Sequence, residues 1–240
     1  MSIVIDGLSK DFGAAPVLEG ISTTITEGEF VAVLGASGCG KSTLLNIVAG
    51  LEAPSAGSVT IPSAGAAFMF QDAALLPWLT ARANIELALE LRGLGRTERR
   101  RRADELLSLV HLSDAGHKRP HEMSGGMRQR TSLARALGQD RPVLLMDEPF
   151  AALDAITRDL LHDELERLWR ADRRTVVFVT HNVREAVRLG QRVLLLSSRP
   201  GRVAAEWSID PAVREDPAAQ TALTREITQR LREEIRQHAH

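Results

Sequence analysis

The chain has 240 residues, of which 44% are apolar and 25% charged, a composition typical of a folded globular protein and unlike that of disordered or collagen-like chains. Its 30 basic residues nearly balance 31 acidic ones, and the net charge of -1 excludes a global field that would attract nucleic acid. No apolar run approaches the roughly 18 residues of a membrane span, and the first residues lack the pattern of a secretory signal. A single cysteine, Cys39, permits no internal disulfide, so we expect a protein of the reducing cytosol.

Short apolar runs alternate with helical patterns along most of the chain, which is typical of an α/β protein whose mostly parallel sheet is covered by helices on both faces. Near the N-terminus, residues 21–25 and 58–61 mix apolar residues with Ser and Thr and predict edge or antiparallel strands in a small β layer. Four continuously apolar runs predict the central strands, buried on both faces. These runs are residues 30–34, 143–146, 176–179 and 193–196.

A glycine-rich loop follows the first central strand and precedes a helical pattern. It consists of Gly35, Ala36, Ser37, Gly38, Cys39, Gly40, Lys41, Ser42 and Thr43. Backbone N–H groups of such a loop surround a phosphate, Lys41 reaches the terminal phosphates, and Ser42 offers its hydroxyl to Mg²⁺. Because the flanking strand and helix match as well as the loop, we predict a triphosphate-Mg²⁺ site in preference to a glycine-rich turn with a surface lysine.

The loop also contains the only cysteine of the chain. Cys39 lies near Lys41 and a predicted helix start, an environment that can lower the pKa of a thiol. We expect either a small residue that simply fits the loop or, if the thiol is accessible, a site whose alkylation inactivates the protein and is prevented by nucleotide.

Between residues 80 and 138 the strand pattern gives way to helical periodicity punctuated by glycine and proline, which predicts a helical subdomain inserted into the sheet. A run of four arginines, residues 99–102, lies within it. Because Asp104 and Glu105 follow at helical spacing, we interpret this run as a solvated helix face with ion pairs, and nucleic-acid binding as the less favoured alternative.

A second glycine motif, Ser124, Gly125, Gly126 and Met127, precedes a helical pattern that ends near residue 137. A serine before two glycines at the start of a helix forms a second anion site of the phosphate-binding kind. Since one chain with one nucleotide needs only one such site, we infer that the second serves the nucleotide of another copy, arranged head to tail. An ordinary capped helix after a loop is the alternative.

Two adjacent carboxylates, Asp147 and Glu148, end the second central strand. At the end of a strand, Asp147 can face the hydration shell of Mg²⁺, while Glu148 can orient a water for attack on a γ-phosphate. The alternative is a pair of exposed acids that begins a turn. The next central strand ends at His181, whose imidazole can hydrogen-bond the γ-phosphate or the water, although many such histidines are purely structural.

The last part of the chain is polar. An Asp216–Pro217 pair predicts a helix start, and apolar residues then recur every fourth position from Leu223 to Ile235. We predict an amphipathic terminal helix that packs on its own domain, with a partner contact as the less favoured alternative. The chain is divided into a core with a β layer, residues 1–79; a helical subdomain, 80–138; the remainder of the core, 139–207; and a tail helix, 208–240.

Together these motifs closely resemble the ATP-binding subunit of an ABC transporter, over roughly residues 1–205. The resemblance implies a P-loop NTPase fold of the ABC type, with ATP and Mg²⁺ as ligands. It assigns Gly35–Ser42 to the Walker A loop and Ser124–Met127 to the signature. It further implies the following roles: Phe12 stacks on adenine, Gln71 forms the Q-loop that contacts the metal and the reacting phosphate, Asp147 binds the metal, Glu148 is the catalytic carboxylate, Asp154 forms the D-loop, and His181 is the switch histidine.

More narrowly, residues 71–78, 147–157 and 196–203 resemble the nitrate/sulfonate/taurine importer branch, with a sulfonate such as taurine or an alkanesulfonate as the first expectation for the solute. The chain departs from the usual pattern at four places. These are Phe12, where tyrosine is common; Met123 and Met127 in the signature; Asn182 after the switch histidine; and a short segment, 57–71, which suggests a trimmed hairpin in the β layer.

The resemblance also implies partners: a homodimer that sandwiches two ATP, membrane permease subunits, and indirectly a solute-binding protein, with no nucleic-acid partner. The chain is then expected at the cytoplasmic face of the cell membrane, as a peripheral subunit. Residues 71–78 are expected to contact the permease, although Leu75, Leu76 and Trp78 would also suit the core between subdomains. A soluble ABC-type ATPase that acts on nucleic acid or ribosomes is the alternative function.

Overall fold

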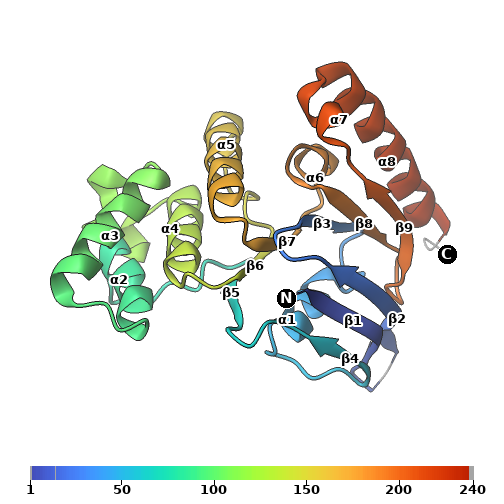
Figure 1. Cartoon of the computed structure of the whole chain (residues 1–240), viewed down its shortest axis with the longest axis horizontal. Helices are drawn as coiled ribbons and strands as arrows, with labels where there is room; N and C mark the ends of the chain where they lie inside the picture. Colours follow the sequence, from blue (N-terminus) through green and yellow to red (C-terminus); the bar gives the residue numbers. More distant parts are fainter. Residues whose placement is uncertain (1, 14, 238–240) are drawn as a thin grey trace.

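The computed structural model describes residues 2–13 and 15–237. A small antiparallel sheet in the order β2-β1-β4 lies on one side of the molecule (Figure 1). Its strands are β1 (Ile3–Asp11), β2 (Pro16–Ile25) and β4 (Ala56–Thr60). Both predicted N-terminal strands therefore belong to one antiparallel layer, paired through β1.

The main sheet has six strands in the order β5-β6-β7-β3-β8-β9. All neighbours are parallel except β9, which runs antiparallel to β8 at one edge. The strands are β3 (Phe30–Gly35), β5 (Ala66–Met69), β6 (Val143–Asp147), β7 (Thr175–Val179), β8 (Arg192–Leu196) and β9 (Val203–Ser208). All four predicted central strands are confirmed.

Both faces of the main sheet are covered, as the continuously apolar strands predict. Along β3, Phe30, Ala32 and Leu34 pack into a core shared with the helices of one face, whereas Val31 and Val33 pack into a second core against α1 and the antiparallel sheet. Because successive side chains of a strand point to opposite faces, a strand between two cores must be apolar at every position.

Eight α-helices occur among the described residues, and α2, α3 and α4 lie together at one end of the molecule (Figure 1). Their bounds are α1 (Lys41–Val48), α2 (Ala81–Leu91), α3 (Arg96–Leu109), α4 (Gly125–Gly138), α5 (Ala155–Asp172), α6 (Val183–Leu189), α7 (Pro211–Glu215) and α8 (Pro217–Gln237). Two short 3₁₀ turns, Ser113–Ala115 and Pro120–Glu122, precede α4. No described helix is long and apolar enough to cross a membrane.

The arginine run lies on α3 and is largely engaged in ion pairs. Arg101 pairs with Glu98 and Glu105, and Arg102 with Glu105. The expected pairing of Asp104 with the preceding turn of the same helix is wrong, because Asp104 pairs with Arg82 of α2 at 2.7 Å. These pairs favour the solvated helix face over a nucleic-acid surface.

The terminal helix α8 packs on its own domain, as the sequence predicts. Its start is held by Asp216, whose carboxylate accepts a hydrogen bond from the Ala218 N–H at 2.9 Å. Ile227 is fully buried and Leu223 and Leu231 pack against the core, whereas Ile235 is 43% exposed. The chain-wide division at residues 80, 139 and 208 stays a prediction.

Candidate nucleotide-binding and hydrolysis site

Four neighbouring parallel strands bring the predicted site residues to one edge of the main sheet. In the order β6-β7-β3-β8, their carboxyl ends carry Asp147 and Glu148, then Thr180 and His181, then the glycine loop, then the loop after Leu196. Ligands of open α/β sheets bind at this edge, because the strand ends open into loops there. The topology therefore unites segments that lie more than a hundred residues apart.

The glycine loop adopts a conformation that only glycine fits readily. Gly38 and Gly40 have φ angles of 78° and 101°, and α1 begins directly after Gly40. A Cβ atom at Gly40 would lie 2.5 Å from Leu18 Cδ2, so a side chain there would also collide with β2. The Lys41 ammonium donates hydrogen bonds to the carbonyls of Gly35 and Ala36, both at 2.9 Å.

A cavity of about 230 Å³ opens in front of this loop. Its lining joins residues of the loop to one residue from each of four other segments, namely Ser37, Gly38, Gly40, Lys41, Ser42 and Thr43 with Val17, Gln71, Glu148 and Arg199. The structure therefore brings Gln71 and Glu148 to the predicted phosphate loop. Arg199, which sequence reasoning missed, donates a hydrogen bond from Nε to the Gly38 carbonyl at 3.0 Å.

Asp147 has the environment of a metal-ligating carboxylate. It is buried, and burial raises its pKa, opposed by a hydrogen bond that the Ser42 hydroxyl donates. Its Oδ1 atom is buried without a hydrogen-bond partner. No group of three acidic, histidine or cysteine ligands occurs among the described residues. One carboxylate and one hydroxyl fit Mg²⁺, because this ion keeps several waters and takes further ligands from substrate phosphates.

Glu148 is held in a strained conformation at the mouth of the cavity. Its φ of 48° is unusual for a residue other than glycine and costs roughly 1–3 kcal/mol. Its backbone is fixed on both sides, since its N–H donates to the Val179 carbonyl at 3.0 Å and its carbonyl accepts from Gln129 Nε2 at 2.7 Å. The His181 Nδ1 atom lies 3.1 Å from Glu148 Oε2. The two side chains thus meet, as their strand positions predict.

Gln129 is a second site residue that the sequence did not reveal. It is buried on α4 and bonds the loop after β6 with both ends of its amide, because its Oε1 also accepts from the Ala152 N–H at 2.8 Å. A glutamine five residues after the serine of a helix cap is an ordinary sequence feature. Only its burial beside Glu148 indicates that it positions this carboxylate.

The turn that carries His181 is fixed by a buried carboxylate on α6. Glu185 accepts hydrogen bonds from Thr180 Oγ1 at 2.6 Å and from Asn182 Nδ2 at 3.0 Å. Arg158 of α5 lies 3.5 Å from the same carboxylate and also donates to the Leu153 carbonyl at 2.8 Å. Asn182, a departure from the expected residue, therefore has a structural partner.

The prospect of a reactive Cys39 is wrong. Its thiol is 1% exposed, and burial raises its pKa despite the nearby Lys41 charge. A Cβ atom at Gly35 would lie 2.6 Å from the Cys39 sulfur, so the cysteine fills the space beneath the loop. Cys39 contributes its backbone to the loop, and its side chain packs in the core.

The second glycine motif begins α4, with Ser124 as the cap that accepts from the Met127 N–H at 3.2 Å. Neither this motif nor Asp154 lines the cavity of the glycine loop. Asp154 caps α5 by accepting from the Thr157 N–H at 3.0 Å. The start of α4 lies against the segment that precedes Asp154, since a Cβ atom at Gly126 would meet the Ala152 carbonyl at 3.1 Å.

Phe12 directly follows β1 of the antiparallel sheet and is not among the lining residues of the cavity. Its ring is 60% exposed, and the Lys10 ammonium lies 4.7 Å from the ring centroid. An exposed aromatic ring with a cation nearby can stack on a base. Its role in adenine binding stays a prediction.

The family model described as ABC transporter matches residues 18–151, more than half of the chain. The chain belongs to the ABC transporter family, and it is an ATP-binding ATPase of that family. It is 49% identical over 210 residues to the taurine import ATP-binding protein TauB of Mesorhizobium japonicum, a match that covers 84% of this chain and 82% of that protein. It is 47% identical to the TauB of Burkholderia pseudomallei, with coverage of 84% and 80%.

Among solved structures, the chain is similar to a dimeric ATP-binding cassette, MJ0796, in a post-hydrolysis state bound to ADP and Pi. The TM-score is 0.81 at 34% sequence identity, and the match covers 87% of this chain and 99% of that one. The fold is therefore that of an ABC-type P-loop ATPase, which confirms the predicted fold class.

The Gln129 contacts lead to a testable expectation. Gln129→Leu removes both amide bonds and leaves the Glu148 carbonyl and the Ala152 N–H unsatisfied, each at a cost of about 1–3 kcal/mol. We expect kcat for ATP hydrolysis to fall by about 10- to 100-fold with little change in KM, because the phosphate loop is untouched.

The matched control is Gln139→Leu, at the other end of α4, which should keep wild-type kcat. Gln129→Glu keeps an acceptor for Ala152 but loses the donor to Glu148, so it should be as slow as Gln129→Leu. Thermal unfolding separates this effect from general destabilisation. An unchanged kcat in a folded Gln129→Leu protein would remove the positioning role.

Proposed function

We propose that this chain is the ATP-hydrolysing subunit of a membrane importer for sulfonates such as taurine or alkanesulfonates, with nitrate as the other solute of this branch. The observation that carries the chemistry is the convergence of the glycine loop, Asp147, Glu148 and His181 at one sheet edge. The solute rests on similarity to taurine import proteins. No residue of the chain is assigned to it.

In this proposal the glycine loop binds the phosphates of ATP. Backbone N–H groups at the start of α1 face the phosphates, and the Lys41 ammonium exchanges the Gly35 and Ala36 carbonyls for phosphate oxygens. Ser42, Asp147 and Gln71 hold Mg²⁺, which supplies charge neutralisation of the β- and γ-phosphates when bound. Phe12 stacks on the adenine.

For hydrolysis, the Glu148 carboxylate accepts a hydrogen bond from the attacking water and takes its proton as the new P–O bond forms and the bond to ADP breaks. His181 lies beside Glu148 and donates to the γ-phosphate, while Lys41 stabilises the developing charge. The strained Glu148 backbone, fixed by Gln129, keeps the carboxylate oriented before the water arrives.

The site is completed by a second copy. Ser124, Gly125, Gly126 and Met127 lie outside the cavity of their own chain, so we place them on the γ-phosphate held by a partner, with Asp154 beside the same interface. ATP then closes a head-to-tail homodimer and hydrolysis reopens it. A dimeric relative of the same fold supports this arrangement.

Movement is passed to the permease through the segment after Gln71. Trp78 is 67% exposed, whereas Leu75 packs against the core, so the tryptophan is the contact we assign to a permease helix. This docking places the chain at the cytoplasmic face of the membrane as a peripheral subunit. A separate solute-binding protein delivers the solute to the permease.

The test is to purify the chain in complex with its permease, reconstitute it in vesicles, and measure ATP hydrolysis with the binding protein loaded with one solute at a time. We expect taurine or an alkanesulfonate to stimulate turnover several-fold and sulfate not to do so. Stimulation by nitrate alone would identify nitrate, and not a sulfonate, as the transported solute. A folded complex that no solute stimulates would contradict the importer proposal.

A further inference from the structure

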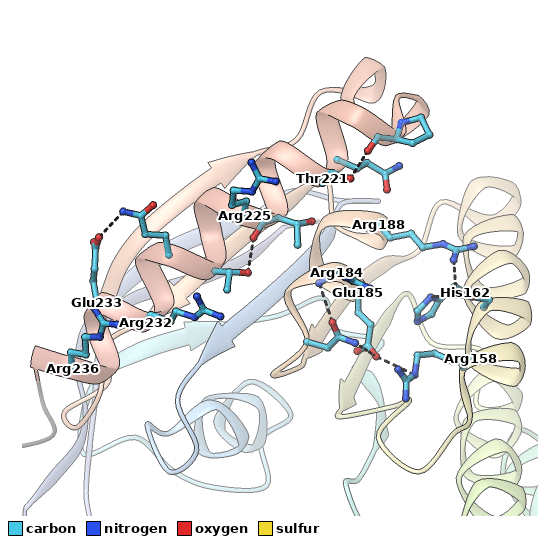
Figure 2. Close-up of a pocket in the computed structure, with 18 residues that line it drawn as sticks. Arg158, His162, Arg184, Glu185, Arg188, Thr221, Arg225, Arg232, Glu233 and Arg236 are labelled. Carbon is cyan, nitrogen blue, oxygen red and sulfur yellow. Dashed lines mark hydrogen bonds and ion pairs between the residues drawn. The ribbon is translucent and has the colours of Figure 1, made fainter.

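A wide groove runs between α5, α6 and α8 (Figure 2). Its volume is about 1150 Å³, and it shares no lining residue with that cavity. Its floor includes Arg158, Asn182 and Glu185, which also line a smaller cavity beside Glu148 and His181. The groove therefore borders the hydrolysis site without belonging to the nucleotide pocket.

The lining of the groove is strongly basic. Among the described residues it contains six arginines against three carboxylates, and all three carboxylates already have partners; Glu233 lies 3.5 Å from Arg230 and accepts from Gln229 Nε2 at 3.2 Å. Asp159 pairs with Arg188 at 2.9 Å, and Glu185 accepts the Thr180 and Asn182 bonds described above. The remaining positive charge is not neutralised by the groove itself.

Four of the arginines form no ion pair with any described residue: Arg184 on α6 and Arg225, Arg232 and Arg236 on α8. The three on α8 are spaced seven and four residues apart, so they share one face of the helix. From first to last they span about 16 Å of helix axis. Guanidinium groups in such a row are forked donors suited to phosphate oxygens.

A buried histidine on the opposite wall has no hydrogen bond to any described residue, although its Nδ1 atom lies 4.0 Å from Asp159 Oδ1 and its ring packs edge-on against Phe150. His162 of α5 is 3% exposed, and neither of its ring nitrogens is hydrogen-bonded by the protein. Figure 2 shows it on α5 beside Arg158 and Arg188. Burial and the Arg188 charge lower its pKa to about 4, so the ring is neutral at pH 7 and offers one N–H and one lone pair. Because buried polar groups are generally hydrogen-bonded, we expect a ligand in the groove to hydrogen-bond the His162 ring.

The shape and chemistry of the groove select the ligand. No aromatic side chain other than His162 and no large aliphatic one lines it, so it offers no slot for a base or an apolar group. A single phosphate cannot reach both ends of a row about 16 Å long. We propose that the groove between α5, α6 and α8 binds a linear polyphosphate anion, either inorganic or the tail of a nucleotide.

A regulatory effect follows if the chain hydrolyses ATP as proposed above. Arg158 joins α5 to Glu185, and this pair at 3.5 Å is the loosest contact of the network that fixes the His181 turn. A polyanion in the groove competes with Glu185 for the Arg158 guanidinium. Binding therefore loosens the turn and lowers turnover.

Binding is tested first, with inorganic tripolyphosphate titrated by calorimetry into the full-length Lys41→Met protein, whose glycine loop is disabled. Arg225→Gln with Arg232→Gln should raise Kd by about tenfold or more. The control pair Arg96→Gln with Arg100→Gln removes the same charge from α3 and should leave Kd unchanged. Equal affinity in all three proteins would overturn the site. Binding of a non-hydrolysable ATP analogue that is tighter than that of tripolyphosphate and is weakened by the same two groove replacements would identify a nucleotide as the source of the phosphates.

Two further measurements test polyphosphate binding in the groove separately from the ATPase function proposed for the chain. The pKa of the His162 ring is measured by NMR titration with and without tripolyphosphate. Tripolyphosphate should raise this pKa in the Lys41→Met protein and leave it unchanged once Arg225 and Arg232 are also replaced. A pKa that tripolyphosphate changes in neither protein would exclude His162 from the site. The ATPase assay compares two proteins that both keep Lys41: the wild-type chain and the variant with Arg225→Gln and Arg232→Gln. With excess free Mg²⁺, tripolyphosphate should slow hydrolysis by the wild-type chain more than hydrolysis by the variant. Equal slowing would assign the effect to the glycine loop and overturn the regulatory role. If the chain lacks ATPase activity altogether, the binding measurement still decides whether the groove holds polyphosphate.

Discussion

Glu148→Gln is expected to lower ATP turnover by about 10²–10⁴-fold, because glutamine keeps the size of the side chain but cannot take the proton of the attacking water. Nucleotide affinity should remain, since the glycine loop and Asp147 are unchanged. With ATP bound and not hydrolysed, the closed dimer should accumulate. Turnover measured under saturating ATP, together with size-exclusion chromatography, checks both outcomes.

The control is Glu215→Gln, which removes an exposed carboxylate from α7 and should leave turnover unchanged. The neighbouring His181 provides a second comparison, because its Nδ1 atom lies 3.1 Å from Glu148. His181→Ala should slow hydrolysis while leaving the water-activating carboxylate in place. Wild-type turnover by a folded Glu148→Gln protein would remove this residue from the role of general base.

Two inactive variants are expected to restore activity when they are mixed. Lys41→Met disables the glycine loop of one chain, and Gly125→Asp places a carboxylate where the second anion site should meet phosphate. An added Cβ at Gly125 meets no described atom closer than 3.7 Å, so this change should not disturb folding. Each protein alone should lose nearly all activity. After random pairing, half of the dimers hold one intact composite site, so activity should return up to about a quarter of the wild-type value, the limit reached if one site can work beside an inactive one.

The measurement is ATPase activity against the ratio of the two variants, with total protein fixed. Lys118→Met removes one of the other lysines of the chain and should keep full activity by itself, which controls for the loss of charge. If the mixture stays as inactive as its components, while each variant is folded and dimeric, the second anion site does not serve the partner's nucleotide. Full activity of Gly125→Asp alone would lead to the same conclusion.

The buried strands and the glycine loop could be predicted because each leaves a local signature. Strands between two cores are apolar at every position, and a phosphate loop combines glycines, a lysine and a hydroxyl in fixed order. Sequence reasoning does not find β1, whose pairing with β2 contains register shifts that break the alternation of buried and exposed residues. It also misses the short edge strands β5 and β9.

Features that depend on packing between distant segments were less predictable. The burial of Cys39 is decided by the approach of Gly35 and β8, and the role of Gln129 by the loop after β6. The arginine row on α8 is visible in the sequence, yet its meaning depends on His162 and Arg184 from other elements. Local sequence specifies elements and motifs well, whereas an amide or imidazole acquires a role only from its three-dimensional neighbours.

The α4 helix links two different ATP molecules in the proposed dimer. Its first turn, capped by Ser124, faces the nucleotide held by the partner, while Gln129 one turn later grips the loop of the Glu148 that acts on the chain's own nucleotide. A displacement of a rigid helix moves both ends together. ATP bound in one pocket thereby affects the catalytic carboxylate of the opposite pocket, so hydrolysis at the two sites would be coupled.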